Sequence, residues 1–220
     1  QPRLARLAAE QYEDNLVRLF RTATQAIAML AGSAAIALVL FARDVLWVWT
    51  GDAVFADHYA IVLRLYAIGN GFLALAAFPY YLQFAKGNMR LHLMGNLVFN
   101  LVLLPTVIIA TRLYGVIGAG SVWASINCLF FLFWTLLVYA KFVLGLYKNW
   151  LLCDILPVLA GPLTLALLLY VLPTPLFSRW GWICFIFLTS CCMVTIAALS
   201  GSFLRPLLFQ TARRMIRQNP

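Results

Sequence analysis

The sequence predicts an all-α fold: a polytopic membrane helix bundle with six transmembrane helices and an N-terminal amphipathic cytoplasmic helix. Hydrophobic residues make up 64% of the 220 residues, charged residues make up 10%, and the mean hydropathy is +0.92. A soluble domain typically carries about a quarter charged residues. The apolar residues form long uninterrupted runs without the alternation of strands, and the charged residues lie almost entirely between these runs.

Six apolar runs are each long enough to cross a bilayer as one helix. A helix needs about 20 residues to span the hydrocarbon core, and a helix satisfies its own backbone hydrogen bonds inside lipid. The predicted spans cover residues 25–42, 59–84, 91–110, 118–140, 152–172 and 181–199. We therefore divide the chain into a four-helix part at 25–140, two additional helices at 141–203 and a basic cytoplasmic tail at 204–220.

Residues 1–24 predict an amphipathic connector helix. It would lie on the cytoplasmic headgroups and join an earlier part of the protein to the first span. Apolar residues recur there at spacings of three and four, and charged residues fill the other face. The apolar set is Leu4, Leu7, Ala8, Leu16, Leu19, Phe20 and Ala23. The sequence begins with Gln1 and carries no signal peptide, so we expect it to be a piece of a longer protein.

Basic residues alternate between the gaps that separate the spans, and this alternation predicts the orientation. The first, third, fifth and seventh gaps hold twelve of the 16 Lys and Arg residues. The second, fourth and sixth gaps hold only Arg43, Arg112 and Arg179, and Arg64 lies inside the second span. Short cytoplasmic loops of membrane proteins are enriched in Lys and Arg. Both termini of this segment are therefore expected to be cytoplasmic.

Motifs that the sequence lacks argue against several classes of function. It has no Walker-type glycine loop, no dinucleotide fingerprint and no His/Cys pair at metal-ligand spacing. Neither His58 nor His92 has a neighbouring arrangement for nucleophilic catalysis. We therefore expect no cofactor, no metal and no enzymatic activity. The net charge of +9 is spread over separate gaps, which favours anionic lipid headgroups over nucleic acid as the partner.

The order of local motifs resembles the C-terminal half of a polysaccharide flippase. The motifs are PRLARLAA at residues 2–9, LWVWTGD at 46–52, PYYLQ at 79–83, AKGNMR at 85–90 and YGVIGAG at 114–120. Their order and spacing are similar to the O-antigen-type branch of the multidrug/oligosaccharidyl-lipid/polysaccharide exporter superfamily. The resemblance covers residues 2–139, whereas the last two spans are a generic apolar pair of the kind that some members carry.

The resemblance implies transport in the bacterial inner membrane. Members move an undecaprenyl-pyrophosphate-linked oligosaccharide from the inner to the outer leaflet for lipopolysaccharide and O-antigen biosynthesis. The implied partners are membrane lipid, the lipid-linked oligosaccharide, an N-terminal lobe missing from this sequence, a polysaccharide polymerase and glycosyltransferases. Such a transporter needs a polar cavity between two lobes that opens to alternate sides.

A polar stripe on the third span is the first candidate for a substrate-cavity surface. His92, Asn96 and Asn100 recur at i, i+4 and i+8 on an otherwise apolar helix. Polar groups are costly in lipid, so the stripe should face a substrate cavity or make hydrogen bonds to another helix. Asn70, flanked by two glycines on the second span, is a weaker candidate, because close packing or a kink explains this segment better.

Two charged residues lie within a span or at its end. Arg64 is about five residues from the outer end of the second span, roughly 7–8 Å deep. Its side chain either snorkels to the interface or serves as a cavity cation for pyrophosphate or sugar acid groups. Asp154, at the inner end of the fifth span, either stabilises a helix start through the helix dipole or takes part in ion coupling.

Two alternative functions remain open at this point. A multidrug extruder of the same superfamily would bury acidic residues for cation coupling, and these spans hold no carboxylate deep inside. A membrane enzyme acting on the lipid carrier would need an acid or a histidine at the interface. The outer gaps offer only Asp44, Asp52, Asp57 and His58, which form no recognisable motif.

Overall fold

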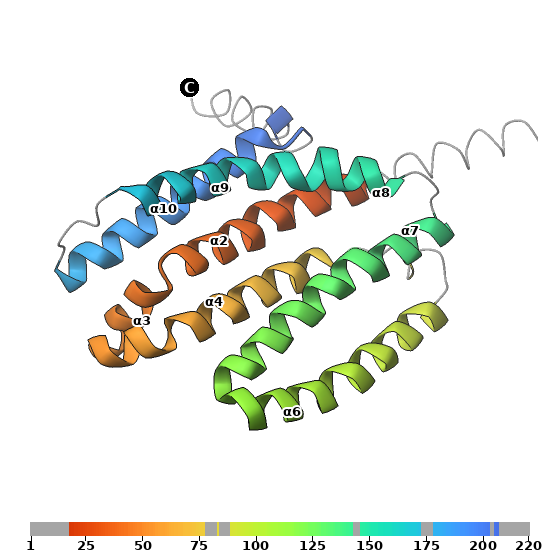
Figure 1. The fold of residues 1–220 in the computed structure, drawn as a ribbon. Coiled ribbons are helices and arrows are strands. Elements are labelled where there is room, and N and C mark those ends of the chain that lie inside the picture. Colours follow the sequence, from red (N-terminus) through yellow and green to blue (C-terminus); the bar gives the residue numbers. More distant parts are fainter. Residues whose placement is uncertain are drawn as a thin grey trace, which may run out of the picture.

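The computed structural model describes residues 18–77, 83, 89–142, 146–172, 178–202 and 205–206. Every regular element in this part of the chain is a helix, which confirms the predicted all-α class (Figure 1). Five of these described helices are long and apolar enough to cross a membrane: Arg18–Leu40, Ala53–Leu75, Met89–Lys141, Tyr147–Val171 and Arg179–Ser200. The chain therefore has the character of a membrane protein.

Several of the spanning helices include a short π-helical segment. The first helix passes through η1 (Ala28–Gly32) into α2 (Ser33–Leu40), and the second is α4 (Ala53–Leu75). The third comprises α6 (Met89–Leu129), η2 (Phe130–Trp134) and α7 (Thr135–Phe142). The fourth runs from α8 (Leu146–Asn149) through η3 (Trp150–Ile155) into α9 (Leu156–Val171), and the last is α10 (Arg179–Ser200).

The helices begin before the apolar runs that predicted them, because their polar first turns are helical too. α4 begins at Ala53 instead of residue 59, and Asp52 caps it by accepting a hydrogen bond of 3.0 Å from the Phe55 backbone N–H. The first helix continues without a break from Arg18 past residue 25. Residues 1–17 of the predicted connector and most of the tail at 204–220 lie outside the described residues.

An additional helix, α3 (Ala42–Thr50), lies between the first two spanning helices. It follows a break at Phe41 and ends at Gly51, whose φ of 75° is the left-handed conformation that terminates many helices. The sequence analysis did not predict α3, because nine residues that mix charges with tryptophans do not form an apolar span. The outer gap is therefore partly helical.

The long helix α6 reverses direction at Gly115, between the predicted spans 91–110 and 118–140. Gly115 has φ 61° and ψ −146°, a combination that other residues adopt only with strain. The two arms approach closely here because Gly118 has no side chain. A Cβ at this position would clash with the carbonyl oxygen of Ala110. The arms lie side by side as a hairpin (Figure 1). Phe99 of one arm packs against Phe130 of the other.

Helix α2 lies at the centre of the bundle. α4 packs along one side of it, and α9 and α10 pack along the other. The α6 hairpin packs mainly on α4 and therefore forms one edge of the molecule (Figure 1). An aromatic core fills the end where α7 meets α8, and its rings belong to Phe20, Phe131, Tyr139, Tyr147 and Trp150.

Among the described residues, the helix ends that flank the sparse basic gaps and those that flank the abundant ones lie at opposite ends of the bundle. α3, the turn of the α6 hairpin and the start of α10 lie together at the left of Figure 1. Arg179, at the start of α10, donates a hydrogen bond of 2.7 Å to the Val48 carbonyl of α3. The start of the first helix, the end of α7 and α8 lie at the other end. This separation is the arrangement that the alternation of basic residues requires.

Candidate functional site

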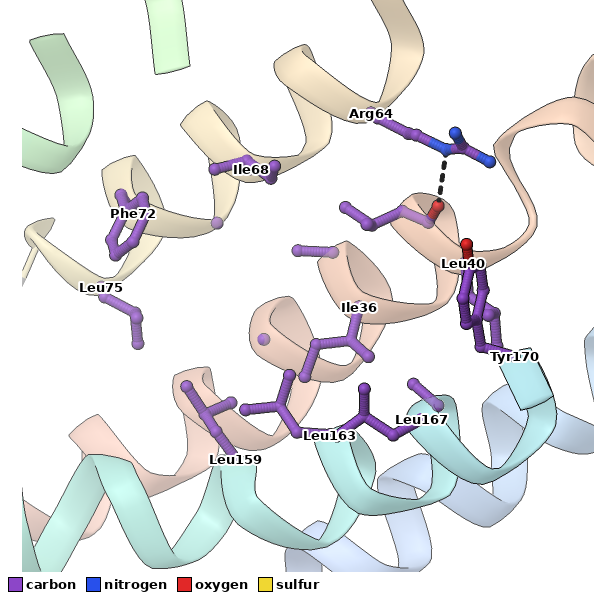
Figure 2. A pocket seen from close by; sticks show the side chains of 15 residues that line it. Ile36, Leu40, Arg64, Ile68, Phe72, Leu75, Leu159, Leu163, Leu167 and Tyr170 are labelled. Carbon is purple, nitrogen blue, oxygen red and sulfur yellow. Dashed lines mark hydrogen bonds between the residues drawn. The ribbon is translucent and has the colours of Figure 1, made fainter. Parts of the chain in front are cut away.

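An apolar groove lies between α4 and α9, with α2 as its floor (Figure 2). Its volume is about 550 Å³, which falls within the range of small-molecule sites. Apart from Arg64 and Tyr170, every residue that lines it is a glycine or has a hydrocarbon side chain. The groove is therefore suited to a hydrocarbon ligand and not to a sugar.

Small residues on the floor let both walls approach α2. A Cβ on Gly71 of α4 would come within 3.0 Å of the Ala35 side chain. A Cβ on Gly32 would clash with the Leu159 side chain of α9. Both walls therefore contact the first helix directly, α9 at Gly32 of η1 and α4 at Ala35 of α2, and the surface of this helix between the two walls is the bottom of the groove.

Arg64 stands at one end of the groove, where it forms a hydrogen bond with the C-terminal end of α2. Its Nε donates a hydrogen bond of 3.1 Å to the carbonyl of Val39 in the last turn of α2. Carbonyls in a last helical turn lack a partner within the helix, and the helix dipole favours a cation there. No described residue accepts a hydrogen bond from the two terminal nitrogen atoms of Arg64. The side chain is thus anchored by one atom and keeps donors available.

Two of the three acidic residues near this end are engaged elsewhere, and the third, Asp44, interacts electrostatically with Arg64. Asp57 pairs with Arg43, and this hydrogen bond raises the pKa of Arg43 above its ordinary value. Asp52 caps α4. Burial raises the pKa of Asp44, against the opposing effect of the Arg43 and Arg64 guanidinium groups. Two of the four polar residues considered for an enzymatic site therefore have structural roles.

The stripe of His92, Asn96 and Asn100 lies on α6, away from the groove. The Asn96 amide nitrogen is 3.0 Å from His92 Nε2, and the Asn100 amide donates to the Asn96 carbonyl at 2.8 Å. Asn96 and Asn100 are exposed, whereas the neighbouring Gly95 is buried against Trp134 of the other arm. The polar face therefore points away from the bundle, and the described structure does not bring it together with Arg64.

Asn70 is exposed on α4 and does not line the groove. The glycines beside it have packing roles, because a Cβ on Gly69 would clash with Trp123 and Gly71 packs on Ala35. α4 runs through this segment without a break. Close packing therefore accounts for the two glycines, and no kink is present.

A buried polar cluster at the opposite end was missed as a cluster by the sequence analysis. Asp154 is fully buried and accepts hydrogen bonds from Arg21 Nε at 2.7 Å, from Arg21 Nη2 at 3.1 Å and from Gln25 at 2.8 Å. The Gln25 amide also bonds Ser202 at 2.9 Å, and Trp150 Nε1 donates to Thr24. Asp154 lies within η3 and does not begin a helix. Its carboxylate is neutralised by Arg21 from the first helix.

A signal for this cluster was present in the sequence. Asp154 is the carboxylate closest to the inner end of a span, and Arg21 is a basic residue just before another span. Charges that lie near the ends of membrane spans commonly pair with one another.

Searches against family models, curated proteins and solved structures give no match for this chain.

Proposed function

We propose that this chain is part of a flippase that translocates an undecaprenyl-pyrophosphate-linked oligosaccharide across the bacterial inner membrane for polysaccharide biosynthesis. The observation that carries the proposal is the polar stripe of the half-buried His92 and the exposed Asn96 and Asn100 on a membrane-length helix. The hydrogen bonds within α6 use one group of each amide, and the amide groups that are still exposed are costly in lipid, so a polar neighbour would stabilise this face. A sugar-conducting cavity between this face and a second lobe would supply one.

Six crossings fit the chain better than five. The helix Met89–Lys141 has 53 residues, and a single straight helix of that length would measure about 80 Å. The hydrocarbon core is only about 30 Å thick. The reversal at Gly115 divides the helix into two arms of similar length, each long enough for one crossing. With the basic-rich end on the cytoplasmic side, both termini of the segment are cytoplasmic.

The alternative functions receive less support from the described residues. A cation-coupled multidrug extruder needs a buried carboxylate that can exchange its counter-ion, but Asp154 is held by Arg21 and Gln25. A membrane enzyme needs an acid free for chemistry at the interface, but Asp52 and Asp57 cap a helix and pair with Arg43. The flippase therefore remains the preferred proposal.

Export of polysaccharide in a flippase-deficient cell tests the role of the stripe. Asn96→Leu and Asn100→Leu, made in the full-length protein, are expected to abolish export at normal membrane abundance, because they remove polar contacts without removing packing volume. Asn149→Leu is the matched control, since Asn149 is exposed at the end of α8 outside the polar stripe. Normal export by both stripe variants would refute the cavity assignment, and loss of abundance would assign the stripe to helix packing.

Single-cysteine labelling tests the six-crossing topology. In a cysteine-free background, cysteines at Asp52, Arg112 and Arg179 are expected to react with an impermeant thiol reagent from outside intact cells. Cysteines at Arg90 and Lys141 are both expected to react only after permeabilisation, because two crossings separate them. Labelling of these two positions from opposite sides would contradict the hairpin, and a fully reversed pattern would overturn the orientation.

A further inference from the structure

We propose that the groove between α4 and α9 binds one anionic phospholipid, with an acyl chain along the groove and the phosphate on Arg64. The lipid comes from the leaflet at the Arg64 end of the bundle. This assignment rests on the groove alone and does not depend on the proposed flippase activity, because the stripe on α6 lies elsewhere.

The length of the groove matches one leaflet. Figure 2 shows Arg64 and Tyr170 at one end and Leu75 and Leu159 at the other. Eleven residues separate the two ends on each wall, which is about 16 Å of helix. Half of the hydrocarbon core is about 15 Å. Arg64 stands beside Leu40 and Tyr170, at the ends of the first and fourth spanning helices, so these neighbours put it closer to the interface than the depth expected from the second span alone. An acyl chain that entered at this level would reach the bilayer midplane where the groove ends.

The groove has an apolar part and a polar end, which match the acyl chain and the headgroup of a phospholipid. Hydrocarbon side chains line most of the groove, whereas the guanidinium of Arg64 and the phenol of Tyr170 stand at one end. Arginine binds phosphate with two parallel N–H donors, and the terminal nitrogen atoms of Arg64 have no acceptor among the described residues. Tyrosine is enriched at the level of lipid headgroups. The charge of Arg64 selects an anionic lipid over a zwitterionic one.

A polyprenyl carrier fits the groove less well than a phospholipid. Its chain is several times longer than an acyl chain, whereas the groove extends only about 16 Å from Arg64 to Leu75 and Leu159, its last lining residues. A bound phospholipid would also fill the space that separates α4 from α9. The lipid would then hold the two walls at a fixed distance on α2.

Native mass spectrometry of the purified full chain tests the proposal. The protein is incubated with an equimolar mixture of phosphatidylglycerol and phosphatidylcholine that have identical acyl chains. We expect one retained phosphatidylglycerol per chain, in preference to phosphatidylcholine. Arg64→Gln is expected to lower that preference about tenfold, because it removes the charge but keeps a donor for the Val39 carbonyl. Ala166→Trp is expected to eliminate retention of both lipids by filling the groove.

Two matched controls separate these effects from general damage. Arg112→Gln removes an exposed arginine at the same end of the bundle, and Leu168→Trp adds a tryptophan to α9 outside the groove. Both are expected to retain phosphatidylglycerol like the wild type.

Four results would overturn the proposal. They are equal retention of the two lipids by the wild type, an unchanged preference in Arg64→Gln, displacement of phosphatidylglycerol by undecaprenyl phosphate at equal concentration, and a dimer that Ala166→Trp dissociates. The last two would assign the groove to the polyprenyl carrier or to a second copy of the chain.

Discussion

Arg21 and Arg64 are both arginines on membrane-length helices, but the protein treats them differently. Arg21 meets the buried carboxylate of Asp154 with two hydrogen bonds, of 2.7 and 3.1 Å. Arg64 gives one hydrogen bond to a backbone carbonyl and faces an apolar groove. The first arginine is paired with a carboxylate of its own chain, whereas the second forms no hydrogen bond or ion pair with a described carboxylate. The pairing of a membrane arginine thus separates a structural role from a binding role.

The pair at the inner end joins three segments that are distant in the sequence. Arg21 and Gln25 lie on the first helix, Asp154 lies in η3, and Ser202 follows α10. A buried ion pair adds little net stability compared with an apolar replacement, but an unpaired buried charge is strongly destabilising. The contrast between the two arginines can therefore be measured by substitutions that remove the contacts of each one.

The largest expected effect comes from Asp154→Ala. It removes a fully buried carboxylate together with the three hydrogen bonds that it accepts from Arg21 and Gln25, and we expect the free energy of unfolding to fall by about 3–5 kcal/mol. The measurement is denaturant unfolding of the purified protein, together with its abundance in membranes. Asp57→Ala is the matched control, because the Arg43–Asp57 pair is exposed and such pairs contribute about 1 kcal/mol or less.

A double variant distinguishes loss of the pair from loss of packing. Arg21→Met combined with Asp154→Leu removes both charges and keeps side-chain volume, so most of the lost stability should return. A double variant as unstable as Asp154→Ala would contradict this account. It would mean that the hydrogen bonds to Gln25, and not the ion pair, hold the segments together.

A smaller effect is expected from Arg64→Ala. It removes one hydrogen bond to the Val39 carbonyl at the end of α2, which corresponds to about 1–2 kcal/mol. The same unfolding measurement in lipid-free detergent checks the value. A loss as large as that of Asp154→Ala would show that Arg64 is mainly structural, and the distinction between the two arginines would then fail.

The sequence predicted the features that depend on composition along the chain. Long apolar runs predicted helices of membrane-spanning length, although the described residues form five such helices where six were predicted, because residues 89–141 continue as one helix through Gly115. The alternation of Lys and Arg predicted that the flanking helix ends share an end of the bundle. α3 was missed because an amphipathic helix of nine residues produces no apolar run. The Arg21–Asp154 pair was missed because its members are 133 positions apart, and only tertiary packing brings them together. The groove likewise arises where α4 and α9 both pack on α2.

The smallest expected effect lies beside Arg64, at Asp44 of α3. Burial raises the pKa of this carboxyl above its ordinary value of 3.8, although Arg43 and Arg64 act in the opposite direction. A raised pKa means that the folded state binds the proton more tightly than the unfolded state does. The ionised Asp44 therefore lowers the free energy of unfolding at neutral pH. This destabilisation is lost as the pH falls through the raised pKa, and it is absent below 3.8.

Asp44→Asn cannot ionise, so it should raise the Tm slightly at pH 7. The advantage should disappear at pH values below 3.8, where the carboxyl is protonated in both states. Thermal unfolding across this pH range measures the difference between variant and wild type. A lower Tm for Asp44→Asn at pH 7 would mean that the attraction of Asp44 to Arg43 and Arg64 outweighs its burial. Arg64 would then be partly neutralised by its own chain, and its charge would be less available to a phosphate.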